Sequence, residues 1–192
     1  MNIAELNKLR DRIGRMTRKL EDKAGTGILG ENTFPNGEVH RFRFEGVMPV
    51  EEFQDNLLSL YVWAWSMKDY LKEVAKGLGK DPRYIESLVD SSPDLQLLSD
   101  IANRSKHGTL NKSRSGRFAS LSGVTFTAPQ QSVSSITVYA FDVIVNVSDP
   151  DQVEYAASVL SDSGLELGNA KEVLSNGIAV WERRGCEYAT SG

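Results

Sequence analysis

The 192-residue sequence predicts an α+β fold that is mostly α: an up-and-down helical bundle with a small two- or three-stranded antiparallel β-sheet after the fourth helix. Apolar residues recur at three- and four-residue steps through much of the first 107 residues, which is typical of helices. β-Branched and aromatic residues then gather between residues 119 and 147, as strands favour. A composition with 40% hydrophobic and 25% charged residues excludes collagen-like, disulfide-scaffold and disordered chains.

The first predicted helix covers residues 2–22 within an N-terminal arm, residues 1–24. Its apolar residues form a narrow stripe like a coiled-coil seam: Ile3, Leu6, Leu9, Ile13, Met16 and Leu20. The stripe can pack on its own domain or on a second copy of the chain. Because exposed apolar patches usually mark interfaces, we expect a homodimer that uses this helix or the central one. The expected interface residues are Leu6, Leu9, Ile13 and Met16.

Residues 25–48 are predicted as a glycine-rich connection with a turn at Pro35-Asn36-Gly37 and a short extended segment at 39–44. The segment Gly25-Thr26-Gly27-Ile28-Leu29-Gly30 matches the letters of a dinucleotide-binding loop. That loop needs a strand before it and a helix after it, and the sequence predicts neither here. We therefore interpret the segment as a flexible linker.

The central helix is predicted to begin near Pro49 and to end at Gly77 and Gly79. Its apolar residues cover most of its circumference, which is typical of a helix at the centre of a bundle. Residues 49–184 are predicted as one bundle with a β-hairpin insert, followed by a flexible tail over 185–192. The remaining predicted elements are helices over 81–89 and 93–107, strands over 119–127, 136–147 and 153–160, and a last helix over 165–184.

Charge is distributed unevenly along the chain, although the net charge is only −4. Residues 1–23 carry seven bases against four acids, and residues 101–141 carry five bases and no acid. Residues 142–192 carry nine acids and three bases. The basic middle can bind a polyanion such as RNA, or it can attract the acidic end within the fold. The candidate RNA- or anion-binding residues are Lys106, Lys112, Arg114 and Arg117.

The polar residues Asp100, Asn103 and His107 share one face of the predicted helix over 93–107. In a cleft, the histidine could act as a general acid or base while Arg104 and Lys106 bind phosphate. The alternative is a hydrogen-bonded seam that fixes helix register or a dimer interface. The single cysteine excludes a Cys-based zinc cluster, and no phosphate-loop or serine-hydrolase motif occurs. We expect no metal and no cofactor.

The sequence resembles the HEPN-like helical superfamily over roughly residues 50–184. The resemblance is carried by Leu60-Tyr61-Val62-Trp63-Ala64-Trp65-Ser66-Met67-Lys68-Asp69-Tyr70-Leu71, by Asp100-x-x-Asn103-x-x-Lys106-His107, and by the later hairpin and Trp181. It implies a helical bundle that is often homodimeric. In active members it implies a metal-independent ribonuclease with an R-x(4–6)-H motif.

The sequence departs from that motif, because the positions that should offer arginine are Asp100, Ile101 and Ala102. Only His107 carries over by position, and Asn103 less securely. We therefore expect a non-catalytic HEPN-like interaction protein, dimeric, that binds RNA or a nucleotide. The alternatives are a metal-independent endoribonuclease using His107, Arg104 and Asn103, and a structural protein–protein adaptor that docks through its first helix.

No signal peptide is predicted, and the most apolar stretch, residues 57–67, is shorter than the roughly 20 residues that cross a bilayer. We expect a cytoplasmic protein with no membrane partner.

Overall fold

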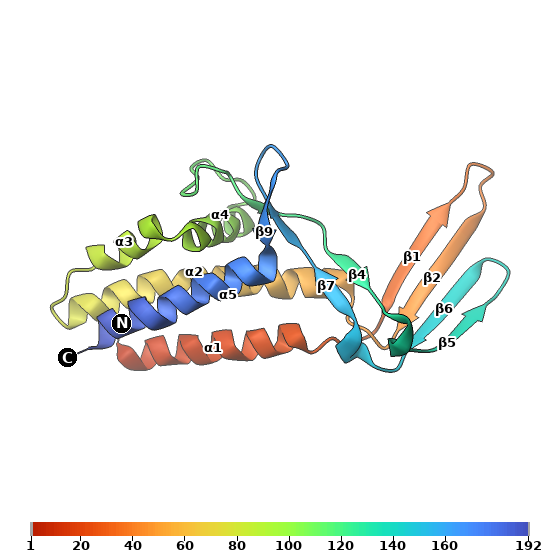
Figure 1. Cartoon of the computed structure of the whole chain (residues 1–192), viewed down its shortest axis with the longest axis horizontal. Coiled ribbons are helices and arrows are strands. Elements are labelled where there is room, and N and C mark those ends of the chain that lie inside the picture. Colours follow the sequence, from red (N-terminus) through yellow and green to blue (C-terminus); the bar gives the residue numbers. More distant parts are fainter. Residues whose placement is uncertain (1, 192) are drawn as a thin grey trace. The chain divides into compact units, whose positions relative to one another are not determined.

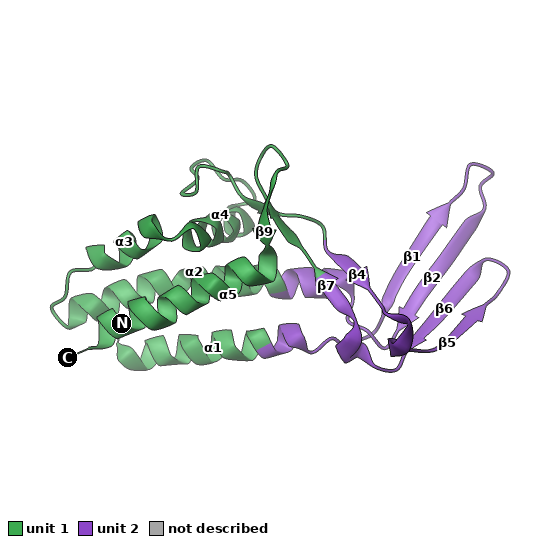
Figure 2. Cartoon of the chain, viewed as in Figure 1, with its two compact units in different colours: residues 1–17, 57–123, 156–192 green, residues 18–56, 124–155 purple. Residues whose placement is uncertain are grey.

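The computed structural model describes residues 2–191, so Met1 of the predicted arm and Gly192 of the predicted tail lie outside the described residues. With 52% helix and 21% strand, the α+β, mostly helical class is confirmed. The chain forms two compact units (Figure 2). Unit 1 comprises residues 1–17, 57–123 and 156–192, and unit 2 comprises residues 18–56 and 124–155. These boundaries differ from the predicted ones at 24 and 48, because helices α1 (Ile3–Glu21) and α2 (Val50–Gly77) contribute to both units.

Unit 1 is mainly helical. Besides most of α1 and α2, it contains α3 (Arg83–Ser91), α4 (Pro93–His107), α5 (Ala170–Val180), a π-helical turn (Trp181–Cys186) and α6 (Glu187–Thr190) (Figure 1). α2 supplies much of the core of unit 1. The Tyr61 hydroxyl of α2 donates a hydrogen bond to the Ala170 carbonyl at 2.7 Å, which joins α2 to the start of α5. The largest fully buried side chains of this core include Leu57, Leu60, Tyr61, Leu71, Leu88, Leu95, Leu98 and Trp181.

Most of the apolar stripe of α1 is buried within a single copy of the chain, although Ile3 at its start is 41% exposed. Leu6, Leu9 and Ile13 are 1%, 4% and 5% exposed, and Met16 is half-buried. Leu6, Leu9 and Ile13 therefore contact the chain's own core, so these three residues of the predicted homodimer interface are already covered, whereas Met16 is only half-buried. The helix begins with a reciprocal cap, in which the Asn2 side chain accepts from the Glu5 amide and the Glu5 carboxylate accepts from the Asn2 amide.

The C-terminal region differs from its prediction in two ways. The predicted helix over 165–184 starts as strand β9 (Glu166–Asn169), and α5 begins only where the Asn169 side chain accepts hydrogen bonds from the Lys171 and Glu172 amides. The predicted flexible tail over 185–192 is ordered through residue 191. Within it, Ala189 is buried and the ring of Tyr188 stacks on Tyr84, with centroids 4.1 Å apart.

Short strands extend unit 1. β3 (Ser120–Leu121), β8 (Ser158–Leu160) and β9 form an antiparallel sheet in the order β3-β8-β9. The strand predicted over 153–160 is split, because β7 (Glu154–Ala156) pairs instead with β4 (Thr125–Thr127), which belongs to unit 2.

Unit 2 contains a four-stranded sheet in the order β1-β2-β6-β5 (Figure 1). Its strands are β1 (Ile28–Thr33), β2 (Val39–Glu45), β5 (Val133–Val138) and β6 (Asp142–Val147). Two antiparallel hairpins meet through a parallel pair, β2 and β6. An antiparallel three-stranded sheet after α4 is present as β3-β8-β9, whereas the four-stranded sheet was not predicted: its β1 and β2 precede α2, and its β2 and β6 run parallel.

The predicted glycine-rich connection is in fact the first hairpin of that sheet. Its glycines fit a strand because one of them makes room for an aromatic ring: a Cβ built on Gly30 would lie 2.0 Å from the Phe42 ring on the paired strand. The interpretation of residues 25–30 as a flexible linker was therefore wrong. Over residues 2–191, no helix is both long and apolar enough to span a bilayer.

Candidate nucleic-acid interface

Helix α4 carries the polar row that the sequence singled out. It begins at the Ser92 cap, whose hydroxyl accepts from the Leu95 amide, and it ends before Gly108, which has a φ of 71°. Along the row, Asp100 is 1% exposed, Asn103 is half-buried and His107 is exposed. The row therefore runs from the core to the solvent.

Two of the three residues expected in a nuclease site, Arg104 and Asn103, have separate hydrogen-bond partners, and His107 is exposed. The Arg104 guanidinium donates to the carbonyls of Phe118 at 2.9 Å and Ala119 at 3.3 Å. The Asn103 amide donates to the Ser99 hydroxyl at 3.4 Å. Among the described residues, no hydrogen bond joins Arg104, Asn103 and His107 to one another. Arg104 thus holds the backbone of the following loop.

Asp100 organises the same loop from its buried position. Its carboxylate accepts from the Ser113 and Ser115 hydroxyls, each at 2.5 Å, from the Arg114 amide at 2.8 Å, and more weakly from the Ala119 amide at 3.4 Å. A buried carboxylate is tolerated only when its oxygens have such partners. Residues 113–119 are therefore fixed against α4 by Asp100 and Arg104 together.

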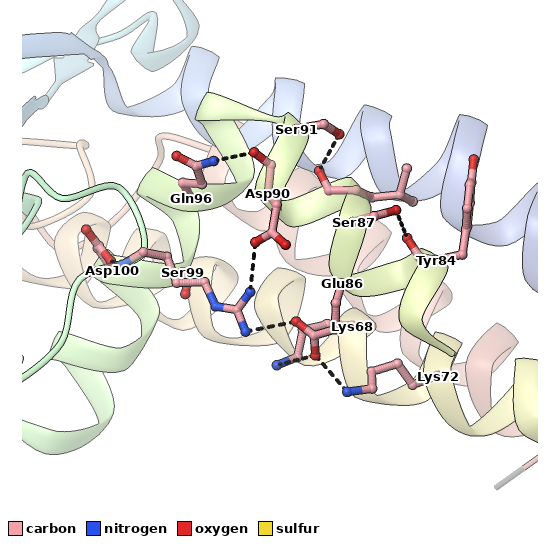
Figure 3. Close-up of polar contacts among 12 residues, drawn as sticks. Lys68, Lys72, Tyr84, Glu86, Ser87, Asp90, Ser91, Gln96, Ser99 and Asp100 are labelled. Carbon is pink, nitrogen blue, oxygen red and sulfur yellow. Dashed lines mark hydrogen bonds and ion pairs between the residues drawn. The ribbon is translucent and has the colours of Figure 1, made fainter. Parts of the chain in front are cut away.

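Glu86 of α3 lies beside Lys68 and Lys72 in an ion-pair cluster (Figure 3), and Arg114 also belongs to this cluster. The Glu86 carboxylate accepts from Lys72 at 2.6 Å and Arg114 at 2.8 Å, and it lies 3.6 Å from Lys68. Burial raises the pKa of Glu86, but these three cations outweigh it and hold the pKa at about 2. Arg114 also lies 3.6 Å from Asp90, so much of its charge is balanced inside the protein.

The other cations of the basic segment remain open to solvent. Lys106, Lys112 and Arg117 are exposed, as is His107, and no ion pair within residues 2–191 involves them. Two basic residues of this segment, Arg104 and Arg114, thus hold the loop through contacts within the protein. The side chains of Lys106, Lys112 and Arg117 are exposed and can bind an anion.

A second cationic surface lies between α1 and α2 in unit 1. We name it the α1–α2 groove; its volume is about 440 Å³ and it is lined by Glu5, Lys8, Leu9, Arg12, Arg15, Trp63 and Tyr70. The cations stand at i, i+4 and i+7 on α1, and the two aromatic residues stand seven apart on α2, so each set shares one helix face. The Arg12 guanidinium carbon lies 4.0 Å from the centroid of the Trp63 ring, a cation–π contact.

The charge of the α1–α2 groove is not balanced by neighbouring acids. In the part of the chain that the structure describes, Lys8, Arg12 and Arg15 form no ion pair, whereas Arg10 on another face of α1 pairs with Glu182 at 2.6 Å. The one acid in the groove, Glu5, already accepts from the Asn2 amide. The sequence analysis missed this site, although the seven-residue spacing of Trp63 and Tyr70 opposite a basic helix was available as a signal.

The chain matches no protein-family model, no curated protein and no solved structure. Interpretation of these surfaces therefore depends on their own geometry. Within residues 2–191, no three His, Cys, Asp or Glu side chains are grouped so as to hold a metal ion.

Proposed function

We propose that this protein is a HEPN-like interaction protein that binds RNA without cleaving it and acts as a homodimer. The observation that carries the proposal is the α1–α2 groove. Proteins that bind single-stranded nucleic acid combine cations that follow the phosphates with aromatic rings on which bases stack. Lys8 and Arg15 offer the cations, Tyr70 offers a ring, and Trp63 lies beside it with one ring face covered by Arg12.

The loop after α4 supports the same function as a second contact. Arg117 lies in the loop over residues 113–119 that Asp100 and Arg104 fix, and Lys106 lies in the last turn of α4, so binding an anion at these two cations costs little ordering entropy; Lys112 lies just before the fixed loop.

Binding is favoured over cleavage because of the partners of Arg104. A nuclease would need this guanidinium near the scissile phosphate, whereas two of its donors bind backbone carbonyls of the loop and hold it there. His107 stands exposed at the end of α4 and has no oriented partner within residues 2–191, unlike a general base held by a second group.

The test is binding of a fluorescein-labelled oligouridylate of about 12 nucleotides, within the usual site size for single strands. Anisotropy is measured between about 50 and about 200 mM salt. The double variant Lys8→Gln/Arg15→Gln should bind more weakly and flatten the salt slope by about 1.4, since each lost phosphate contact removes about 0.7. Arg12 is left in place because it covers Trp63.

The matched control is Arg83→Gln/Arg183→Gln, which removes two exposed charges outside the groove and the loop. Equal weakening in both double variants would mean that only net charge matters and would overturn the groove assignment. If the wild type does not bind at the lowest salt, the proposal fails and the protein–protein adaptor becomes the better hypothesis.

Cleavage is tested on the same RNA in EDTA, where we expect it to stay intact. Metal-independent cleavage that is lost in His107→Ala, with an unchanged melting temperature, would contradict the proposal and establish the endoribonuclease instead.

A further inference from the structure

The four-stranded sheet of unit 2 has two chemically different faces. Residues paired across neighbouring strands share a face, and successive residues of a strand alternate between faces. The register aligns Phe42 with Val143 and Val138 in one row, and Phe44 with Val145 and Ile136 in the next. We name these six residues the apolar sheet face. The opposite face is mixed: Arg41 and Arg43 lie on it and pair with Glu31 and Glu45 at 3.6 and 3.5 Å, beside Leu29 and Ile144.

Much of the apolar sheet face is open to solvent. Val138 is 71% exposed, Ile136 is 62% and Phe42 is 37%. Only one end is covered, where Val145 is 8% exposed and the ring of Phe126 lies 5.1 Å from that of Phe44. Apolar side chains concentrated on the solvent side of a sheet indicate a surface that a partner covers.

We propose that a second copy of this chain covers the apolar sheet face, so that two sheets form a face-to-face sandwich. Domains usually bury a sheet between two layers, and sheets pack aligned at about 10 Å when each offers a flat apolar face. The six residues carry no charge, so two identical faces meet without repulsion. This inference names the surface of the homodimer included in the proposed function and does not depend on RNA binding.

The size of the face sets the strength expected of this contact. Four strands about 4.8 Å apart and six residues long, at about 3.3 Å per residue, cover about 20 by 20 Å. Because one end of the apolar sheet face is already covered, two copies bury at most about 800 Å² of planar area. This is below the roughly 1,000 Å² of a stable specific interface, so we infer a weak dimer.

The test is sedimentation equilibrium between about 1 and about 200 µM, concentrations that bracket a micromolar Kd. The wild-type mass should rise from one chain toward two. Val138→Lys should raise the Kd at least about tenfold, because the sandwich would bury an unpaired ammonium. The matched control, Thr137→Lys, puts the same charge on the opposite face of the same strand and should leave the Kd unchanged.

Ile136→Ser is a second, milder variant at an exposed position and should weaken the dimer in the same direction, and melting curves confirm that each variant is folded. A wild-type monomer at every concentration overturns the inference. A dimer that Val138→Lys leaves intact, or that Thr137→Lys weakens as much, overturns this surface. RNA anisotropy on Val138→Lys separates the two proposals, since lost dimerisation with retained binding leaves the α1–α2 groove unaffected.

Discussion

Replacing Asp100 with alanine should release the loop over residues 113–119 from α4. The carboxylate is 1% exposed and accepts three short hydrogen bonds, from two serine hydroxyls and the Arg114 amide. Hydrogen bonds to a charged acceptor contribute about 1.5–3 kcal/mol each, which gives an upper range of about 4.5–9 kcal/mol. When the loop opens, however, its donors recover bonds to water. We therefore expect a loss of about 2–4 kcal/mol in the free energy of unfolding.

Asp100→Asn keeps the shape and one acceptor oxygen but turns an amide donor toward other donors, so it should cost about half as much, about 1–2 kcal/mol. Urea unfolding followed by circular dichroism measures both losses. With a slope near 2 kcal/mol/M, Asp100→Ala should lower the midpoint by about 1–2 M. Hydrogen exchange should show faster exchange at the Arg114 amide, which donates to this carboxylate.

The reasoning would be refuted if Asp100→Ala had the midpoint of the wild type and its Arg114 amide stayed protected. Such a result would mean that the Arg104 contacts to Phe118 and Ala119 suffice to hold the loop.

Two further predictions concern the helical unit. The pKa of Glu86 is lowered to about 2, so its ion pairs stabilise the fold fully above the unfolded pKa near 4.5, and that stability is lost as pH falls toward 2. Because the Glu86 side chain is partly exposed, screening by solvent reduces this loss in the free energy of unfolding to about 1–2 kcal/mol. The Glu86→Gln variant cannot titrate, so its acid unfolding curve should lack this loss. Gly177→Ala should lower the melting temperature despite alanine's better helix propensity, because the new Cβ would lie 2.7 Å from Leu98, which is fully buried. A higher melting temperature in Gly177→Ala would show that Leu98 moves aside at no cost.

Local signals in the sequence predicted the helices well. The helix predicted over 93–107 has those bounds in the structure because both of its ends are encoded nearby, by the Ser92 cap and by Gly108. The first hairpin was missed because its glycines indicate a loop, and only the facing ring of Phe42 explains Gly30. The parallel partner of β2 was also beyond prediction, since β6 lies almost 100 residues further along and no local pattern identifies it.

The candidate site was predicted only in part, for a related reason. The charge count found the basic segment but could not tell which cations are already used. Arg104 donates hydrogen bonds to backbone carbonyls, and Arg114 forms ion pairs with carboxylates on α3. Each arginine is distant in the sequence from its partners. The α1–α2 groove was missed because Lys8 and Trp63 become neighbours only when α1 packs against α2.

The parallel pairing of β2 with β6 has a consequence for how the chain is made. About 100 residues separate these strands, which at about 5–20 residues per second means a delay of about 5–20 s on the ribosome. During that time β2 has an open hydrogen-bonding edge, and Phe42 and Phe44 have no β6 beside them. Arg41, Arg43 and Glu45 alternate with or flank these rings, and charged residues on an unpaired edge oppose association between nascent chains. The same charged side chains that face solvent in the finished sheet thus oppose aggregation of the chain before β6 has been made.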